Sequence, residues 1–497
     1  MQPPPLAASA GAQRRKGRLI SPVPVAMRCL AGELTRPRRP EPLHGVRASA
    51  ILEACENKHE TMPANPPKTR STRSRARANA APTAVAPAPV TPAPGRTATP
   101  AELARAYQTV ALVLQGGGAL GAYQCGVYEA LHGAGLRPDW FVGTSIGAFN
   151  AAILAGNAPE RRVERLHEFW DTICEPVGPA ASVAAGVRTL LAWYPNIPPL
   201  DQWANSMGAL GALAFGQQGF YHLRMPPPLL IGDGSPATTS FYDTTPLKST
   251  LERLVDFNRI NSRASGVRLT VGAVEVETGN DHYFDSWHET IRPEHLMASG
   301  ALPPGFPAIE IDGKHYWDGG VVSNTPLERV WDDKPRRDSL VLQVDLWSAR
   351  GELPVNMIEV LERQKDIQYS SRTRLVTDHG ARMQKLRLAI SDVLAQAPEG
   401  TLDPRLRRAL APWACTHVFN IVHLIYQSKP HEAQFKDYAF GLGTQHEHWA
   451  DGHADMEQTL EYPDFFVKPA PEVGVVTHDV HRIVAARRQH GPRADSA

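Results

Sequence analysis

Cysteine is scarce in this sequence, and long hydrophobic runs are missing. The 497 residues include five cysteines, an odd number without Cys-x-x-Cys spacing, so neither a disulfide framework nor a cysteine-rich zinc site is expected. No stretch approaches the roughly 18 apolar residues of a membrane-spanning helix, and the N-terminal residues lack the pattern of a secretory signal. These absences favour a soluble protein of the reducing cytoplasm.

Net charge is also small, at +1, but its distribution is uneven. Residues 1–105 carry 17 Lys and Arg against 6 Asp and Glu, which leaves 35 and 45 for the rest of the chain. The same segment holds 17 of the 44 prolines, and such a composition cannot bury enough apolar surface to fold. We predict that residues 1–105 form a disordered basic tail. The Arg-rich stretch 68–80 is interpreted as solvated, without a specific nucleic-acid partner, and contact with an anionic membrane is the alternative.

Alternating strand and helix patterns begin near Tyr107. Residues 109–115 (TVALVLQ) form a continuous apolar run of strand length, as expected for a parallel strand covered on both faces. A glycine loop follows, then a helical pattern over 123–135, a second strand at 140–145 and a second helix at 146–156. This order predicts a βαβ unit within a layered α/β fold.

Two long regions depart from this alternation. Residues 176–235 are apolar and rich in glycine and proline, and their aromatic residues include Trp193, Trp203 and Phe215. They fit either an irregular insertion packed on the core or a lid beside an apolar site. Beyond residue 350 the apolar spacing becomes helical. We therefore predict a core domain over 106–350 and a helical appendage over 351–490, whose role the sequence leaves unassigned.

The glycine loop, Gly116 to Gly121, reads Gly-Gly-Gly-Ala-Leu-Gly and contains the G-x-G-x-x-G pattern of dinucleotide-binding folds. Asp139 follows about 20 residues later, but a ribose-binding acid should end the second strand, whereas Asp139 precedes it. The alternative is an oxyanion hole, in which backbone N–H groups of consecutive glycines point toward one position. We favour the oxyanion hole.

Ser145 lies between Gly143 and Gly147 at the end of the second predicted strand. The G-x-S-x-G pattern is typical of a nucleophile elbow, a tight strand-to-helix turn that exposes a serine hydroxyl and needs small residues around it. Because both loops follow neighbouring parallel strands, Ser145 and the glycine loop should meet at the carboxyl edge of the sheet. A serine nucleophile requires a base.

Two kinds of residue are candidates for the base that would activate Ser145. The first is a histidine, as in Ser-His-Asp esterases; the candidates are His379, His417, His423, His446 and His448, none of which lies in a distinctive turn. The second is Asp318 in WDGGVVSNTP. A predicted hairpin around Gly313-Lys314 precedes it, and a turn at Gly319 and Gly320 follows it. An aspartate in such a place also serves simply to shape a turn.

Three segments together resemble the patatin-like phospholipase family over roughly residues 110–330: QGGGALGAYQCGVYEAL, FVGTSIGAFNAAILAGN and WDGGVVSNTPL. The run ASGALPPGFPAIEIDG before the Asp-Gly-Gly turn is also similar to that family. The C-terminal region resembles a bacterial patatin subgroup with an additional domain. The resemblance implies a three-layer α/β/α fold with a mostly parallel sheet.

The same resemblance implies a site without histidine. Ser145 would be the nucleophile and Asp318 the base, and Gly116, Gly117 and Gly118 would frame the oxyanion hole. Family members often carry Arg or Lys at the fifth residue of the glycine loop, where this sequence has Leu120. Cationic help from that position is therefore not expected.

The predicted function is hydrolysis of a lipid acyl ester, without metal or cofactor. Phospholipid, lysophospholipid, neutral glyceride and polyester substrates are all compatible with the sequence, and a lipid substrate makes peripheral membrane contact a further expectation. Two alternatives come from other classes. One is a Ser-His-Asp esterase on a different topology, and the other is a catalytically inactive lipid-binding or scaffold protein.

Overall fold

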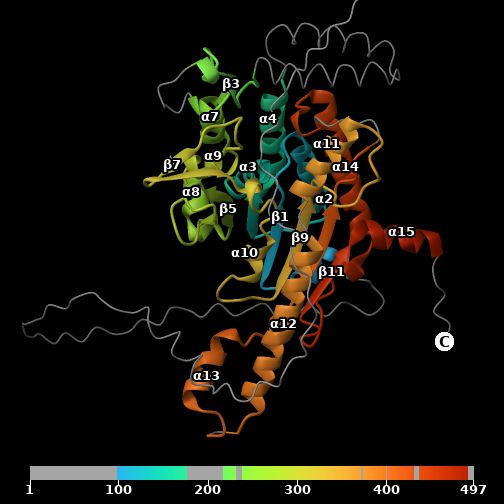
Figure 1. The fold of residues 1–497 in the computed structure, drawn as a ribbon. Helices are drawn as coiled ribbons and strands as arrows, with labels where there is room; N and C mark the ends of the chain where they lie inside the picture. Colours follow the sequence, from blue (N-terminus) through green and yellow to red (C-terminus); the bar gives the residue numbers. More distant parts are fainter. Residues whose placement is uncertain are drawn as a thin grey trace, which may run out of the picture. The chain divides into compact units, whose positions relative to one another are not determined.

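The computed structural model describes residues 98–175, 216–230, 238–370, 373–398, 400–429 and 436–490 (Figure 1). All of these residues belong to one compact unit, Ala86–Ala497. The predictions for the basic tail up to residue 97 and for Trp193, Trp203 and Phe215 lie outside the described residues.

A nine-stranded sheet forms the centre of the described fold, in the order β11-β10-β9-β1-β2-β5-β8-β7, with β6 also paired to β5. The pairings among β11, β10, β9, β1, β2 and β5 are parallel, and those of β6, β7 and β8 are antiparallel. The strands are β1 (Thr109–Leu114), β2 (Trp140–Thr144), β5 (Arg268–Glu275), β6 (Asp281–Asp285), β7 (Ile309–Ile311), β8 (Lys314–Asp318), β9 (Ser339–Asp345), β10 (Phe419–Ile425) and β11 (Val475–Asp479). The predicted mostly parallel sheet is confirmed.

Helices cover both faces of this sheet (Figure 1). Alternate residues of β1 point to opposite sides, because side chains alternate along a strand: Leu112 lies in the larger apolar cluster and Val113 in the smaller one. The larger cluster includes residues of α2 (Ala122–Gly133), α3 (Ile146–Ala155), α4 (Arg162–Cys174), α7 (Thr245–Leu254), α9 (Pro293–Ser299) and α14 (Leu442–Leu460). The smaller cluster includes residues of α10 (Leu327–Trp331) and of α12 (Thr373–Gln396). The fold is therefore a three-layer α/β/α sandwich.

Apart from short 3₁₀ helices, the remaining described elements are short or peripheral. They are α1 (Pro100–Ala104), α8 (Phe257–Asn261), α11 (Met357–Tyr369), α13 (Pro404–Leu410), α15 (Val480–His490), and a two-stranded ribbon of β3 (His222–Leu223) and β4 (Tyr242–Asp243). The predicted hairpin before Asp318 is present as β7 and β8. Its two turn residues are Asp312 and Gly313, whose φ values of 51° and 81° are those that a type I′ turn requires. Lys314 is therefore the first residue of β8 and not part of the turn.

The region beyond residue 350 differs from the predicted helical appendage. Its described residues form five α-helices, as the spacing indicated, but also β10 and β11, which extend the central sheet. In addition, α14 packs closely on α2: a Cβ on Gly126 would lie 1.9 Å from the Trp449 carbonyl oxygen, and one on Gly452 would lie 2.0 Å from that of Tyr123. The prediction was incomplete because a short apolar run such as FNIVHLI does not by itself distinguish a strand from a buried helix.

Candidate active site

Ser145 occupies a strained turn between β2 and α3. Its φ of 55° and ψ of −128° make it one of two non-glycine residues with positive φ in the described part of the chain, a conformation that costs about 1–3 kcal/mol. The turn is held from behind, because the Ser145 N–H donates to Ser299 Oγ (2.9 Å) and that hydroxyl donates to the Gly272 carbonyl (2.6 Å). The local geometry is that of a nucleophile elbow.

Both glycines of the elbow are needed for close backbone approach. A Cβ on Gly143 would lie 2.3 Å from the carbonyl oxygen of Gly147, and a Cβ on Gly147 would lie 2.4 Å from that of Leu114. Real Cβ atoms do not reach such distances without moving the backbone. The first turn of α3 is therefore seated directly on the end of β1, which leads into the glycine loop.

Asp318 lies beside Ser145 because β2 and β8 share one edge of β5. β2 pairs with the first part of β5, ending at Thr144 opposite Gly272, and β8 pairs with the next part, ending at Asp318 opposite Ala273. β6 occupies the other edge of β5. The two strand ends thus meet at successive residues of β5, and the sequence-predicted partners come together although 173 positions separate them in the chain.

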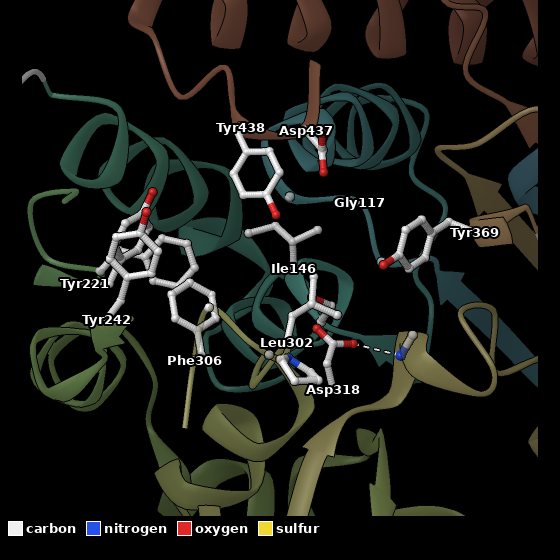
Figure 2. A pocket seen from close by; sticks show the side chains of 18 of the residues that line it. Gly117, Ile146, Tyr221, Tyr242, Leu302, Phe306, Asp318, Tyr369, Asp437 and Tyr438 are labelled. Carbon is white, nitrogen blue, oxygen red and sulfur yellow. Dashed lines mark hydrogen bonds between the residues drawn. The ribbon is translucent and has the colours of Figure 1, made fainter. Parts of the chain in front are cut away.

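The Asp318 carboxyl is buried, with only 2% of the residue exposed. Burial raises its pKa to about 7, although hydrogen bonds from the Ser145 side chain and from the Gly320 backbone oppose the shift. The Gly320 N–H donates to Asp318 Oδ1 at 2.7 Å (Figure 2). Gly319 also fits tightly, since a Cβ there would lie 2.8 Å from the Gly272 carbonyl oxygen. A carboxyl group with this pKa can accept a proton at neutral pH.

The glycine loop is oriented by two side chains that hold one carbonyl. Trp347 Nε1 and Asn324 Nδ2 both donate to the Gly116 carbonyl oxygen, at 2.9 and 3.0 Å. Because C=O and N–H point in opposite directions across a trans peptide, the Gly117 N–H points away from these donors. Among the described residues, no acceptor contacts the N–H groups of Gly117 or Gly118. These groups can therefore receive a developing negative charge.

The other positions of the loop are sterically constrained. Gly116 faces the elbow, because a Cβ there would lie 3.0 Å from Ser145 Cβ, and Gly118 has a φ of 56°, which favours glycine. A Cβ on Gly121 would lie 2.7 Å from Ile146 Cγ1. Leu120, at the position where family members often have a cation, is fully buried in the larger apolar cluster. It brings no charge to the site.

Gln115, which sequence reasoning did not single out, connects the loop to three other elements. Its Nε2 donates to Thr325 Oγ1 (2.8 Å) and to the Tyr369 carbonyl (3.1 Å), while its Oε1 accepts from the backbone N–H groups of Leu346 and Trp347. All these partners lie more than 200 residues away. The only signal in the sequence was its place immediately before the three glycines.

A cavity of about 300 Å³ opens beside Ser145 and Asp318 (Figure 2). One side of it is an aromatic wall, which we define as Phe149, Phe220, Tyr221, Tyr242, Phe306 and Phe440. Their rings contact one another with centroids 4.8 to 6.0 Å apart. Phe220 and Tyr221 lie within the predicted insertion over residues 176–235, and this part of it lines the cavity.

The opposite side of the cavity is more polar. We define this polar wall as Trp347, Tyr369, Asp437 and Tyr438, the last two from a short 3₁₀ helix, η8 (Lys436–Tyr438). η8 lies directly on the glycine loop, because a Cβ on Gly118 would come within 2.2 Å of the Asp437 carbonyl oxygen. Figure 2 shows the Asp437 carboxyl and the hydroxyls of Tyr369 and Tyr438 directed into the cavity. None of these four residues was predicted from sequence.

The five candidate histidines lie elsewhere. None of them lines the cavity. His423, on β10, is buried and its Nε2 lies 2.7 Å from Asp345 Oδ2, and His417 contacts Asp338 at the amino end of β9 (3.0 Å). Within the described residues the side chain that accompanies Ser145 is therefore the carboxyl of Asp318.

The fold and site define an α/β/α protein with a serine elbow, an adjoining buried aspartate and a glycine loop at one sheet edge. Residues 112–331 match the family model described as patatin-like phospholipase, and residues 367–472 match a second model described as patatin phospholipase. Together the two ranges cover more than half of the chain. The chain belongs to the patatin-like phospholipases.

Curated relatives match a short part of the chain. Lysophospholipase nte1 of Aspergillus terreus is 55% identical over 87 residues, which are 16% of this chain and 6% of that protein. The human patatin-like phospholipase domain-containing protein 6 is 41% identical over 73 residues, or 14% of this chain and 5% of that protein. The chain thus aligns with only about a twentieth of each relative's length.

Among solved structures, VipD from Legionella pneumophila has 13% sequence identity and a TM-score of 0.28, with coverage of 77% of this chain and 74% of that one. ExoU from Pseudomonas aeruginosa, solved with SpcU, has 16% identity and a TM-score of 0.20, with coverage of 67% and 70%. Similarity at this level does not transfer a function. No described helix of the chain is both long and apolar enough to span a bilayer.

The raised pKa of Asp318 predicts that this carboxyl destabilises the fold at alkaline pH. A shift from 3.8 to about 7 lowers the free energy of unfolding by on the order of 4 kcal/mol above pH 7. The cost develops as pH rises between these two values, because the unfolded chain then binds fewer protons. Asp318→Asn should therefore be as stable as wild type or more stable at pH 8, and the gain should shrink toward pH 4.

Urea unfolding at both pH values measures this difference. Asp312→Asn is the matched control, because its side chain is 78% exposed and occupies a turn that asparagine also accepts. A loss of stability in Asp318→Asn at pH 8, beyond that of the control, would contradict the prediction.

Proposed function

We propose that this protein is a lipid acyl hydrolase in which Ser145 is the nucleophile and Asp318 the general base. The observation that carries the proposal is the pairing of an elbow serine with a buried carboxyl whose pKa is raised to about 7. A serine hydroxyl is a weak nucleophile unless a base takes its proton. A carboxylate with an ordinary pKa near ~3.9 would be a poor base at neutral pH, and burial removes that difficulty.

In the first half-reaction, Ser145 Oγ attacks the acyl carbonyl carbon while its proton passes to Asp318. The negative charge on the carbonyl oxygen is stabilised by the N–H groups of Gly117 and Gly118. The C–O bond to the alcohol then breaks, and the protonated Asp318 returns its proton to the leaving alkoxide. The alcohol departs and the acyl group remains as an ester of Ser145.

In the second half-reaction, water replaces the alcohol. Asp318 accepts a proton from the water as its oxygen attacks the acyl-serine carbonyl, and the same N–H groups stabilise the oxyanion. Collapse of the intermediate releases the carboxylic acid and returns the proton to Ser145 Oγ. The aromatic wall supports an acyl substrate, because it offers an apolar surface beside the reacting carbon, and each buried methylene contributes about 0.8 kcal/mol.

The two alternatives find less support. A Ser-His-Asp esterase would need a histidine beside Ser145, and the five candidates lie away from the cavity. An inactive binding protein does not require a serine held at a φ of 55° or a carboxyl whose pKa is raised to about 7, since both features lower the free energy of unfolding. Such costs are typical of catalytic sites.

Peripheral membrane contact is the second part of the proposal. Met225, Leu229 and Leu230 are 76, 86 and 79% exposed, and apolar side chains at this exposure are candidates for insertion into a lipid surface. They follow β3, and the ribbon of β3 and β4 includes Tyr242 of the aromatic wall. A lipid surface against this segment would place its acyl chains beside the cavity.

For the dyad, we expect Ser145→Ala and Asp318→Asn each to lower kcat/KM on an acyl ester at least about a thousandfold. The double variant should be no worse than either single one, because the two residues act as a unit. A p-nitrophenyl ester assay, with circular dichroism to verify folding, measures this. The dyad is wrong if either folded variant keeps substantial activity. Asp312→Asn serves again as the control.

The pH profile follows from the same carboxyl. Because ionised Asp318 is the active form, kcat/KM should fall about tenfold per pH unit below about 7 and level off above it. Rates on a soluble p-nitrophenyl ester between pH 5 and 9 test this expectation. A flat profile from pH 5 to 8 would show that Asp318 is not the group that limits the reaction.

For membrane contact, we expect Met225→Ser, Leu229→Ser and Leu230→Ser together to weaken vesicle binding by about tenfold or more, because apolar burial in the lipid is lost. Hydrolysis of a soluble ester should change little by comparison. Leu406→Ser is the control, since Leu406 is 48% exposed and does not line the cavity. Equal vesicle binding by the triple variant and the control would exclude this segment as the contact surface.

A further inference from the structure

The charges around the cavity are unevenly arranged. Two acidic residues, Asp318 and Asp437, line it, whereas no lysine, arginine or histidine does so among the described residues. Asp437 belongs to the polar wall and Asp318 lies near it: burial raises the pKa of Tyr369 and of Tyr438 most, and both carboxyls add to the shift. The reacting ester therefore meets carboxyl and hydroxyl groups, and no cation.

Two lysines that contact rings of the polar wall are each paired with a carboxylate. Lys365 Nζ lies 2.5 Å from Asp437 Oδ1, and 4.8 Å from the centroid of the Tyr438 ring. Lys436 Nζ lies 2.7 Å from Asp366 Oδ1 and 5.3 Å from the Trp347 ring. Each ammonium thus already has a carboxylate partner, so an anionic group in the cavity would compete with Asp437 or Asp366 for it, and separating such a pair is costly.

The polar wall is instead suited to hydroxyl groups. Burial raises the pKa of both Tyr369 and Tyr438, so each phenol keeps its proton and can donate a hydrogen bond. The Asp437 carboxylate has two oxygens that accept several hydrogen bonds, of which Lys365 supplies one. The polar wall thus offers both hydrogen-bond donors and a hydrogen-bond acceptor. An alcohol group can use both, because its hydroxyl donates and accepts hydrogen bonds.

Given the proposed acyl hydrolase function, on which this inference rests, the geometry points to an uncharged, hydroxyl-bearing alcohol as the leaving part of the substrate. The acyl chain lies on the aromatic wall, the ester carbonyl lies at Ser145, and the alcohol lies against Tyr369, Asp437 and Tyr438. The substrate class is thus a neutral polyol ester of the monoacylglycerol type, and esters of a glycerol phosphate are disfavoured.

Three octanoyl esters with the same acyl chain test this assignment. Monooctanoylglycerol, octanoyl-glycerol phosphate and p-nitrophenyl octanoate are compared below their micelle-forming concentrations, so that membrane binding does not enter. We expect kcat/KM for monooctanoylglycerol to exceed that for the phosphate by at least about tenfold. Equal or faster hydrolysis of the phosphate would overturn the inference. If wild type cleaves no octanoyl ester, the p-nitrophenyl one included, the proposed function fails and the inference with it.

Two variants locate the preference on the polar wall. Tyr438→Phe should lower the ratio of monooctanoylglycerol to p-nitrophenyl octanoate hydrolysis by about three- to tenfold, because the aryl ester has no hydroxyl to lose a hydrogen bond. Asp437→Asn should lower the same ratio. It should also reduce the difference in kcat/KM between monooctanoylglycerol and octanoyl-glycerol phosphate. Tyr438→Phe keeps the Lys365 ion pair, so it remains informative if Asp437→Asn folds poorly. Tyr462→Phe, which does not line the cavity, is the matched control, and a ratio in Tyr438→Phe equal to that of the control would overturn the assignment.

Discussion

The shared edge of β5 is the constraint on which the rest of the site depends. β2 runs parallel to β5 and stops at Thr144, and β8 runs antiparallel and stops at Asp318, opposite the next residue of β5. Two strands of opposite direction therefore end at one point, with a serine turn on one and an aspartate on the other. Gly272 in β5 ties them together, since its carbonyl accepts the Ser299 hydroxyl that holds the elbow.

The region beyond residue 350 completes this site. It extends the sheet through β10 and β11, packs α14 on α2, and places η8 against the glycine loop. Just before it, Trp347 holds the Gly116 carbonyl, and α11 ends at Tyr369, whose carbonyl accepts from Asn324 and Gln115. The loop that would stabilise an oxyanion is thus oriented by side chains and backbone groups from several parts of the chain. A catalytic core cut at residue 350 would lose Tyr369, Asp437, Tyr438 and Phe440 from the cavity wall.

Strain and burial are concentrated where the chemistry would occur. Ser145 has an unfavourable backbone conformation, and Asp318 is a carboxyl removed from water; both lower the free energy of unfolding. The surrounding layers are densely apolar on both faces of the sheet, so this cost is offset elsewhere. The same burial that weakens the fold raises the pKa of Asp318 to about 7, as the proposed general base requires.

The features that the sequence determined by itself are local ones. The apolar run of β1, the three glycines after it, the serine between two glycines and the Asp-Gly-Gly turn each depend on a few neighbouring residues, and all four appear where predicted. The tertiary structure alone decided how distant segments meet: Gln115 with Leu346, Gly118 with Asp437, and the aromatic wall assembled from segments between residues 149 and 440. Such contacts follow from strand order and helix packing, which no short stretch of sequence encodes. The polar wall and the lysines paired behind it, which set the charge around the cavity, therefore emerge only when the chain is folded.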